Sequence, residues 1–323
     1  MILPTKSRIK KTHLRIYDWY SLHGRDDLPW RKTEDPYHIY LSEVMLQQTQ
    51  VGTVLERFYF PFLEQFPTLK KLGDASLDDV LKMWEGLGYY NRAKNLHKTA
   101  QSIEALPQDL EALLALPGIG KNTAHAIMAF VFKEPVPVME ANVKRILCRL
   151  HKLKMPSNTV LWEAAYVLVD KKNPFDYNQA MMDIGSMVCT PKNPSCDICP
   201  LSNICQGKST PTLYPTKKKR VVPAREENIM ITVYNDKLSM VQRSGKFLHG
   251  LWGFPSTEVP LCASEYIGEV THAYTHFKLT CRVHFYDELD KEQTHYFSPH
   301  EIRKLAISKV DEKILNLYLE AVL

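Results

Sequence analysis

Long apolar runs are missing from this sequence. No stretch approaches the roughly 18 consecutive apolar residues that a membrane helix needs, so we expect no transmembrane segment. No continuous apolar stretch follows the N-terminal Met1, which argues against a secretory signal. Acidic residues are absent before Asp18, and an organelle transit peptide therefore remains an open alternative.

Internal repeats and low-complexity tracts are also absent. The 323 residues suffice for two domains of ordinary size, each with its own core. Hydrophobic residues at 45% and charged residues at 24% are typical of a globular protein and exclude a disordered one. A net charge of +5 permits nucleic-acid binding, but many unrelated proteins share it.

Strand-like alternation is scarce up to about residue 205, where the pattern is helical. Asp35 and Pro36 predict a helix start, with the aspartate as N-cap and the proline at the first helical position, and we expect this helix to run to about Gln50. Further helices are expected near 76–85, 91–105, 109–116, 121–132, 141–151 and 160–171.

The character of the chain changes after Cys205. Residues 206–225 hold a glycine, three prolines and a run of four cations from Lys217 to Arg220, and we interpret them as a basic linker. These cations would form either a solvated cluster or contacts to phosphates. Strands are expected at 229–234, 238–242 and 279–286, and helices near 299–305 and 309–321. The sequence thus predicts a multidomain protein, with a mainly α domain over 1–205, the linker over 206–225 and an α+β domain over 226–323.

Four of the seven cysteines fall within 17 positions, in the pattern Cys-x6-Cys-x2-Cys-x5-Cys. They are Cys189, Cys196, Cys199 and Cys205. A zinc ribbon usually pairs two Cys-x2-Cys knuckles, and only one is present; disulfides fit poorly with an intracellular chain. Four thiolates on one short loop suit an iron–sulfur cluster, whose irons each need one sulfur ligand. The pattern resembles the cluster loop of the endonuclease-III-like DNA glycosylases, and the resemblance implies a [4Fe-4S] cluster. The scattered Cys148, Cys262 and Cys281 are expected to be buried thiols.

A second motif, Leu-Pro-Gly-Ile-Gly over 116–120, separates two expected helices. Gly118 and Gly120 permit a tight turn with close backbone approach, and the free N–H groups of the next helix attract an anion. Alone, this motif is more often a plain loop. Beside the cysteine loop, it resembles the helix-hairpin-helix of the same superfamily, expected over about 111–130, which grips one DNA strand without reading its sequence.

The residue two positions after the second hairpin glycine is Asn122. Bifunctional members of the superfamily carry a lysine there, which attacks the sugar and then cleaves the strand. An amide cannot form a Schiff base, and Lys121 lies about 100° away around the helix. The resemblance therefore implies a monofunctional enzyme that removes a base and leaves the backbone intact.

The most specific segment is Leu-Ser-Glu-Val-Met-Leu-Gln-Gln-Thr-Gln over 41–50. Together with Leu-Pro-Trp-Arg over 28–31, Gly-Leu-Gly-Tyr-Tyr over 86–90 and the segment 175–185, it resembles the adenine DNA glycosylases (the MutY family). The resemblance covers nearly the whole chain. It implies hydrolysis of the N-glycosidic bond of adenine mispaired with 8-oxoguanine or guanine in double-stranded DNA.

Such a reaction needs two carboxyl groups. Adenine leaves only when a ring nitrogen is protonated, and Glu43, on an otherwise apolar helix, could hold a proton near neutral pH if burial raises its pKa. A second carboxylate stabilises the oxocarbenium-like sugar. The family carries an aspartate where this chain has Glu140, and the resemblance implies that Asn142, two residues later, also belongs to the catalytic set. The longer side chain of Glu140 moves the carboxylate outward by roughly 1.4 Å. Three outcomes are open: Glu140 works through a rotamer that compensates for its length, the enzyme is slow, or the protein binds the lesion without turnover. We favour the first and expect an active enzyme with some loss of rate.

Base flipping requires a side chain that fills the gap in the stack. By resemblance, Gln48 and Tyr89 fill it, while Trp30, Arg31 and Gln179 lie near the flipped adenine; core packing is the alternative for Trp30 and Tyr89. The resemblance also assigns DNA-binding or substrate-binding roles to Leu28, Gln47, Thr49, Gly118, Gly120 and Asn122.

The segment 248–255, Leu-His-Gly-Leu-Trp-Gly-Phe-Pro, resembles the start of the MutT-like (Nudix-related) domain of this family. The metal-binding signature of active Nudix hydrolases is missing, so lesion recognition is the expected role. Tyr274, Thr275 and His276 resemble the family's Phe-Ser-His loop, which meets 8-oxoguanine; an ordinary strand with an exposed histidine is the alternative.

Two other functions remain open: a thymine or uracil mismatch glycosylase, and a lesion-binding protein without turnover, for which Glu140 is the only support. We expect a monomer that acts on DNA in the bacterial cytoplasm and nucleoid.

Overall fold

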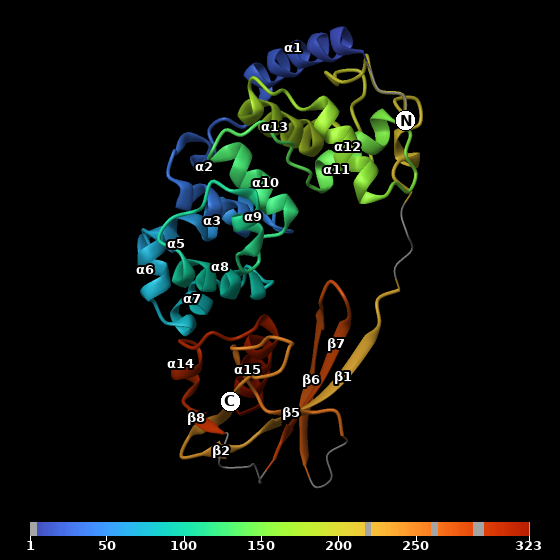
Figure 1. The fold of residues 1–323 in the computed structure, drawn as a ribbon. Coiled ribbons are helices and arrows are strands. Elements are labelled where there is room, and N and C mark those ends of the chain that lie inside the picture. The colour runs from blue at the N-terminus through green and yellow to red at the C-terminus, as the bar shows by residue number, and fades with distance from the viewer. Residues whose placement is uncertain (1–4, 217–220, 260–263, 287–293, 323) are drawn as a thin grey trace. The chain divides into compact units, whose positions relative to one another are not determined.

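The computed structural model describes residues 5–216, 221–259, 264–286 and 294–322. The chain forms two compact units (Figure 1). The first unit comprises residues 1–48 and 103–218, and the second comprises 49–102 and 219–323. The chain therefore leaves the first unit after Gln48 and returns to it at Ile103. The cationic run of the expected linker, Lys217–Arg220, lies outside the described residues.

The first unit is helical. Side chains at Thr5, Asp35, Asp109 and Ser157 each accept a hydrogen bond from the first turn of the helix that they precede. The helices are α1 (Lys6–His23), α2 (Pro29–Lys32), α3 (Pro36–Leu46), α9 (Leu110–Ala115), α10 (Lys121–Phe130), α11 (Ala141–Leu150), α12 (Asn158–Leu168) and α13 (Pro174–Asp183), followed by a π-helical turn at Ile184–Val188 and a 3-10 turn at Pro211–Leu213.

Among its described residues, two hydrophobic clusters hold this unit together. The larger buries residues of α1, α11, α12 and α13, among them Ile16, Ile146, Leu147 and Ala180, and packs against the cysteine loop. The smaller joins α3 to α10 through Ile39 and Phe130.

The helix expected from Asp35 begins as predicted, but it ends at Leu46 and not near Gln50. Gln48 adopts a φ of 60°, which breaks the helix before the polar segment finishes. Helices α1 and α13 were not among the predicted ranges.

The second unit begins with short helices. They are α4 (Val51–Arg57), α5 (Tyr59–Gln65), α6 (Leu69–Asp74), α7 (Leu77–Met83) and α8 (Asn91–Ser102). Phe62, Leu72, Leu81 and Trp84 are fully buried among them. Asn91–Ser102 matches the predicted helix, whereas α4, α5 and α6 were not predicted.

The remainder of the second unit is an α+β domain with two sheets. In the first, β1 (Ala224–Ile231) pairs in parallel with β7 (Lys278–Phe285), and β5 (Ser256–Thr257) and β6 (Glu265–Ala273) flank them antiparallel in the order β5-β1-β7-β6. The second sheet contains β2 (Val233–Tyr234), β3 (Lys237–Gln242), β4 (Trp252–Gly253) and β8 (His295–Phe297).

Helices α14 (Pro299–Ile302) and α15 (Lys309–Val322) complete this domain, and α15 packs against β6. Strand β6 was not predicted, because its polar sequence Glu-Tyr-Ile-Gly-Glu-Val-Thr-His-Ala lacks the alternation of a half-buried strand.

Helices α7 and α8 contact the α+β domain through hydrogen bonds. Lys94 Nζ donates to the carbonyl of His249 at 2.9 Å, and Gln242 Nε2 donates to Asp78 Oδ1 at 3.0 Å. The sequence pattern predicts these helices as part of the N-terminal domain, and the predicted limits of the domains stay a prediction. No helix within the described ranges is both long and apolar enough to cross a membrane.

Candidate functional site

Glu43 lies on α3, a helix whose residues from Ile39 to Met45 are all buried. Its exposure is 7%. Burial and, to a smaller extent, the negative charge of Glu140 raise the pKa of this carboxyl, and the positive charge of Arg31 partly opposes them, so that the pKa is about 8. Glu43 is therefore protonated at neutral pH.

Glu140 immediately precedes α11 and is partly exposed. Its carboxyl does not cap the helix that it precedes, so it is not held by the first-turn N–H groups. Burial raises the pKa of Glu140 as well, and the two carboxyls act on one another electrostatically. Two like charges in a partly buried site resist simultaneous ionisation, which favours one protonated and one ionised carboxyl.

Asn178 on α13 fixes the backbone that leads to Glu140. Its Oδ1 accepts from the N–H of Val138 at 2.8 Å, and its Nδ2 donates to the carbonyls of Val136 at 2.9 Å and Pro174 at 2.8 Å. This buried amide, which carried no predicted role, holds the segment before α11 in a defined position.

Asn142 is held by Arg145, one turn along α11. Arg145 Nη2 donates to Asn142 Oδ1 at 2.7 Å and to the carbonyl of Gly185 at 2.6 Å, and its Nε donates to the carbonyl of Cys189 at 2.7 Å. A Cβ on Gly185 would lie 2.6 Å from Asn142 Cβ, so only glycine permits this packing. The first turn of α11 is thereby connected to the start of the cysteine loop.

Arg31 is engaged by Asp183. Its two Nη atoms donate to the aspartate oxygens at 2.7 and 2.9 Å, and Arg25 donates to the same carboxylate. Burial raises the pKa of Asp183, but the two arginines outweigh it and the pKa is lowered. The family resemblance implies a position for Arg31 near the flipped base; in the structure its guanidinium forms this ion pair.

Trp30 and Gln179, the other residues expected near the flipped adenine, are buried, as is Leu28. Leu28 and Trp30 are each 5% exposed, and Gln179 lies on α13 one turn before Asp183. Asp183 was missed by the sequence analysis. The available signal was its position as the second acid of the otherwise mostly apolar or amide segment 175–185.

The hairpin between α9 and α10 has the expected geometry. Gly118 adopts a φ of 75°, which favours glycine, while Gly120 forms the N-cap of α10 and has open space where a Cβ would project. Ile119, 4% exposed, anchors the turn between them. The exposed first turn of α10 contains no acid, so its N–H groups can receive a phosphate.

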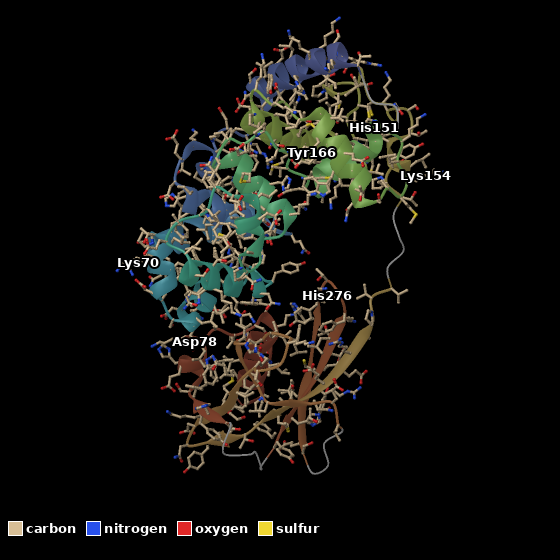
Figure 2. The ribbon with its side chains drawn as sticks, in the orientation of Figure 1. Lys70, Asp78, His151, Lys154, Tyr166 and His276 are labelled. Carbon is tan, nitrogen blue, oxygen red and sulfur yellow. The ribbon has the colours of Figure 1, made fainter. Side chains whose placement is uncertain are left out.

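Asn122 is exposed beside the hairpin, whereas Lys121 is directed to α12. The Lys121 ammonium lies 4.3 Å from the ring centroid of Trp162. Buried His125 places Nδ1 2.8 Å from the carbonyl of Lys121 and Nε2 2.8 Å from the hydroxyl of Tyr166, which is labelled in Figure 2. Because a carbonyl can only accept, Nδ1 donates to it and Nε2 accepts from the tyrosine.

Gln47 connects the end of α3 to the hairpin, because its Nε2 donates to Thr123 Oγ1 at 3.2 Å. The next residue, Gln48, is exposed and left-handed. In the second unit, Gly88 and Tyr89 also have positive φ, 76° and 51°, and Tyr89 is partly exposed. A left-handed residue other than glycine costs about 1–2 kcal/mol, so such positions need support from their surroundings.

The four cysteines of the loop line one small pocket together with Arg149. Arg149 Nη1 donates to Cys189 Sγ at 3.2 Å and to the carbonyls of Cys189 and Thr190. The described cysteines are free thiols, and no His, Cys, Asp or Glu group among the described residues is arranged to hold a single metal ion. Four thiols around one pocket fit a cubane, which distributes its ligands over four irons.

Cys148 and Cys281 are buried as expected, and Cys262 lies outside the described residues.

Tyr274 begins the turn between β6 and β7. Its ring packs on Phe247 and Phe277, with centroids 5.0 and 5.1 Å away, and its hydroxyl is buried. Thr275 and His276 are exposed at the turn, where His276 is labelled in Figure 2, and Thr275 Oγ1 lies 2.8 Å from His276 Nδ1. The hydroxyl and imidazole face solvent, whereas the tyrosine ring packs against the domain.

Three family models match the chain. Residues 41–166 match the HhH-GPD superfamily of base excision DNA repair proteins, 189–205 match the iron-sulfur binding domain of endonuclease III, and 228–317 match the NUDIX domain. These matches confirm the predicted fold class, a helical glycosylase domain with a cluster loop and a Nudix domain, and they confirm the [4Fe-4S] cluster as cofactor.

Two solved structures resemble the helical part. A thermostable thymine-DNA glycosylase superposes with a TM-score of 0.57 at 28% identity, over 63% of this chain and 99% of that chain. Endonuclease III in a non-covalent DNA complex superposes with a TM-score of 0.56 at 20% identity, over 64% of this chain and 98% of that chain, a likeness of fold.

Curated relatives agree over longer stretches. The adenine DNA glycosylase of Buchnera aphidicola subsp. Schizaphis graminum is 34% identical over 266 residues, which cover 78% of this chain and 76% of that protein. The adenine DNA glycosylase of Homo sapiens is 32% identical over 360 residues, covering 83% of this chain and 65% of that protein. Similarity at this level, over most of its length, shows that the chain is a base excision repair glycosylase that belongs to the adenine DNA glycosylase family.

Proposed function

We propose that this chain hydrolyses the N-glycosidic bond of adenine opposite 8-oxoguanine or guanine in duplex DNA and leaves the backbone intact. The observation that carries the proposal is the carboxyl of Glu43, whose pKa of about 8 keeps it protonated at neutral pH. A buried, protonated acid is the group that adenine departure requires.

Glu43 and Glu140 divide the chemistry between them. Glu43 donates its proton to a ring nitrogen of adenine, so that the base leaves as a neutral molecule. Glu140, ionised beside it, stabilises the positive charge that develops on the sugar, and water completes the hydrolysis. Asn178 and Arg145 hold the residues on either side of Glu140 in position. The cluster, when bound, supplies no group to these steps and organises the loop 189–205.

Release of the base without strand cleavage is supported by the residues after the hairpin. Asn122 has no nucleophilic amine, and the neighbouring Lys121 ammonium packs over the Trp162 ring. A DNA strand gripped by the hairpin would therefore meet no Schiff-base lysine at that position.

Gln48 and Tyr89 are proposed to fill the gap that the flipped adenine leaves. Both have left-handed backbones and some solvent exposure, which suits side chains that project from tight turns. For the base opposite, the exposed Thr275 and His276 supply a hydroxyl and an imidazole that can read a purine edge. Tyr274, with its ring packed on Phe247, supports this turn.

The test is a single-turnover base-release assay on labelled duplexes that contain A opposite 8-oxoguanine, A opposite G, or T opposite G. We expect release of adenine, no strand cleavage before alkali treatment, and a loss of at least about 10²-fold in Glu43→Gln. Thymine release would favour a thymine glycosylase, for which the 28% identical thymine-DNA glycosylase is the precedent. Tight binding without release of either base would identify a lesion-binding protein.

Specificity for the opposite base needs its own variant. Thr275→Ala/His276→Ala should lower the ratio of the rates on A:8-oxoguanine and A:G, because both polar groups that face solvent at the turn are removed. Lys278→Ala, an exposed change just beyond the turn, is the control for surface substitution in the same hairpin. An unchanged ratio in the double variant would refute this assignment.

The proposed active form is a monomer in the bacterial cytoplasm.

A further inference from the structure

Arg92 is a buried cation on α8, 9% exposed, in the second unit. It follows Tyr89 by three residues in the sequence, and its side chain contacts the backbone of the loop that contains Tyr89. Its Nη2 donates to the carbonyl of Gly88 at 3.2 Å and to that of Leu87 at 3.4 Å. The guanidinium thus binds the backbone of the two residues that precede Tyr89.

Two aromatic rings also contact this guanidinium. Arg92 Cζ lies 5.3 Å from the ring centroid of Tyr89 and 5.5 Å from that of Trp84. Trp84, fully buried, additionally donates from Nε1 to the carbonyl of Gly88 at 3.1 Å. The carbonyl of Gly88 therefore accepts from both side chains, which fixes the peptide plane between Gly88 and Tyr89.

That peptide joins two left-handed residues. A tyrosine does not favour a φ of 51° by itself, so the conformation depends on contacts that stabilise it. Arg92 provides both kinds of contact, hydrogen bonds to the backbone before the tyrosine and a cation–π contact with the ring itself.

The same Nη2 reaches a second segment, since it lies 3.2 Å from Thr49 Oγ1. Thr49 directly follows Gln48, the other residue proposed to fill the gap in the DNA stack. One guanidinium therefore binds the backbone before Tyr89 and the side chain of the residue after Gln48, although the two proposed gap-filling residues are 41 positions apart in the chain.

We propose that Arg92 is a positioning residue for base flipping: it holds Tyr89 in the conformation in which its ring enters the DNA stack, and it hydrogen-bonds Thr49, the residue after Gln48. The inference rests on the proposed function, in which Tyr89 and Gln48 fill the gap. Arginine suits this role because its planar fork donates to several acceptors at once and stacks on rings, whereas a lysine offers only a compact ammonium. Burial lowers the pKa of Arg92 to about 10, which leaves the guanidinium charged at neutral pH.

The experiment measures flipping directly. A duplex carries 2-aminopurine beside the target adenine opposite 8-oxoguanine, and the protein carries Glu43→Gln, so that fluorescence reports unstacking without excision. In this background the variants are Tyr89→Ala, Arg92→Met, Arg92→Lys and the double variant Tyr89→Ala/Arg92→Met. Single-turnover excision is measured for the same set with Glu43 restored.

The matched control is His97→Leu. His97 is buried on the same helix, and its Nε2 lies 3.0 Å from the carbonyl of Ala75, away from the Tyr89 turn. The control removes a buried hydrogen bond from α8 and leaves the Arg92 contacts in place. Thermal unfolding of each variant shows whether Arg92→Met and His97→Leu lose similar stability.

We expect Arg92→Met to lower the flipping equilibrium and the excision rate at least tenfold, with the double variant no worse than its worse parent. Arg92→Lys, which keeps the charge, should fall between Arg92→Met and the native chain, and His97→Leu should flip normally. If Tyr89→Ala lowers flipping but Arg92→Met does not, or if the two effects multiply, the positioning role is wrong while the proposed function stands. Normal flipping by Tyr89→Ala would overturn the gap-filling assignment and the inference with it. If His97→Leu and Arg92→Met lost flipping and excision equally, the effect of Arg92→Met would be a loss of stability, and the positioning role would be wrong.

Discussion

At the scale of single residues, the proposed chemistry depends on the proton that the carboxyl of Glu43 holds. The sequence shows a glutamate at this position, but the protonation state depends on the surroundings of the side chain in the fold. The pattern around Glu43 predicts an apolar helix, and burial on that helix raises the pKa of its carboxyl to about 8. The neighbouring charge of Glu140 acts in the same direction, and this contribution could not be predicted from sequence because it depends on the distance between two segments 97 positions apart.

The excision rate should therefore fall as the pH rises through about 8, because the donor loses its proton there. On the acid side the rate should fall when Glu140 becomes protonated; its pKa is also raised by burial, so this limb lies above the ordinary range of a glutamate. A single-turnover pH profile from 4.5 to 9.5 measures both limbs. Because the carboxyls are coupled, the two midpoints belong to the pair. A rate that stays constant from pH 7 to 9.5 would contradict the assignment of Glu43 as acid.

The same shift affects stability. A carboxyl whose folded pKa is raised from 4.5 to about 8 contributes stability that is complete below the unfolded pKa and is lost as the pH rises through the folded pKa. Glu43→Gln should remove this dependence and be more stable than the native chain at pH 8–9, by an amount on the order of a few kcal/mol. Urea unfolding at pH 5, 7 and 9 measures it, with the exposed Glu64→Gln as the control. Parallel pH curves for the native chain and Glu43→Gln would show that the carboxyl is not held protonated by the fold.

Glu140 tests the geometry of the second carboxyl. Glu140→Asp draws the carboxylate back by roughly 1.4 Å, to the length that the family resemblance implies, and should match or exceed the native rate. Glu140→Gln keeps the length and removes the charge, and should lose about 10²-fold or more. Single-turnover excision on A:8-oxoguanine compares the two. Excision by Glu140→Gln at the native rate would show that the charge has no catalytic role.

At the scale of elements, the hairpin offers two glycines with different physical roles. Gly118 has a φ of 75°, so Gly118→Ala strains the backbone and should lower the unfolding free energy by about 1 kcal/mol or more. Gly120 has an ordinary φ of −88° and open space around its Cβ position, so Gly120→Ala should fold normally. It should weaken DNA binding, because the added methyl would lie at the proposed phosphate contact. Thermal unfolding and DNA titration at two salt concentrations separate these effects. The reverse pattern would contradict the assignment of the hairpin.

Elements with strong local signals were predictable, and those fixed by distant contacts were not. Asp35 with Pro36 correctly predicts the start of α3, but its end depends on the left-handed Gln48. Strand β6 lacks the alternation of apolar and polar residues that marks a half-buried strand, and Val270 is the one residue of this strand that is buried. Arg31 shows the same limit in the site. Its positive charge acts on the carboxyl of Glu43, yet its guanidinium binds Asp183, a partner 152 positions away that no local pattern indicates.

At the scale of the whole molecule, the order of segments in the chain differs from their grouping in space. The chain inserts residues 49–102 between two parts of the first unit, and these helices pack with the Nudix domain in the second. The local residue pattern predicts the change from helices to strands after Cys205, because the pattern typical of a strand is visible within a few consecutive residues. The packing of α7 and α8 on the Nudix domain depends on contacts such as Gln242 with Asp78, which composition cannot reveal.

Lys94 provides a test of this packing. Its ammonium, 8% exposed, donates to the carbonyl of His249 at 2.9 Å, directly before the segment that leads into β4. Lys94→Met keeps the aliphatic contacts and removes a charged donor, so it should lower the unfolding free energy of the second unit by about 1–3 kcal/mol. Because α8 and the Nudix domain share this contact, amide exchange should accelerate in both 91–102 and 249–254. Lys98→Met, exposed on the same helix, should change either quantity by less than about 0.5 kcal/mol. If exchange accelerates in α8 alone, the helix and the Nudix domain open independently, and the second unit is not one cooperative body.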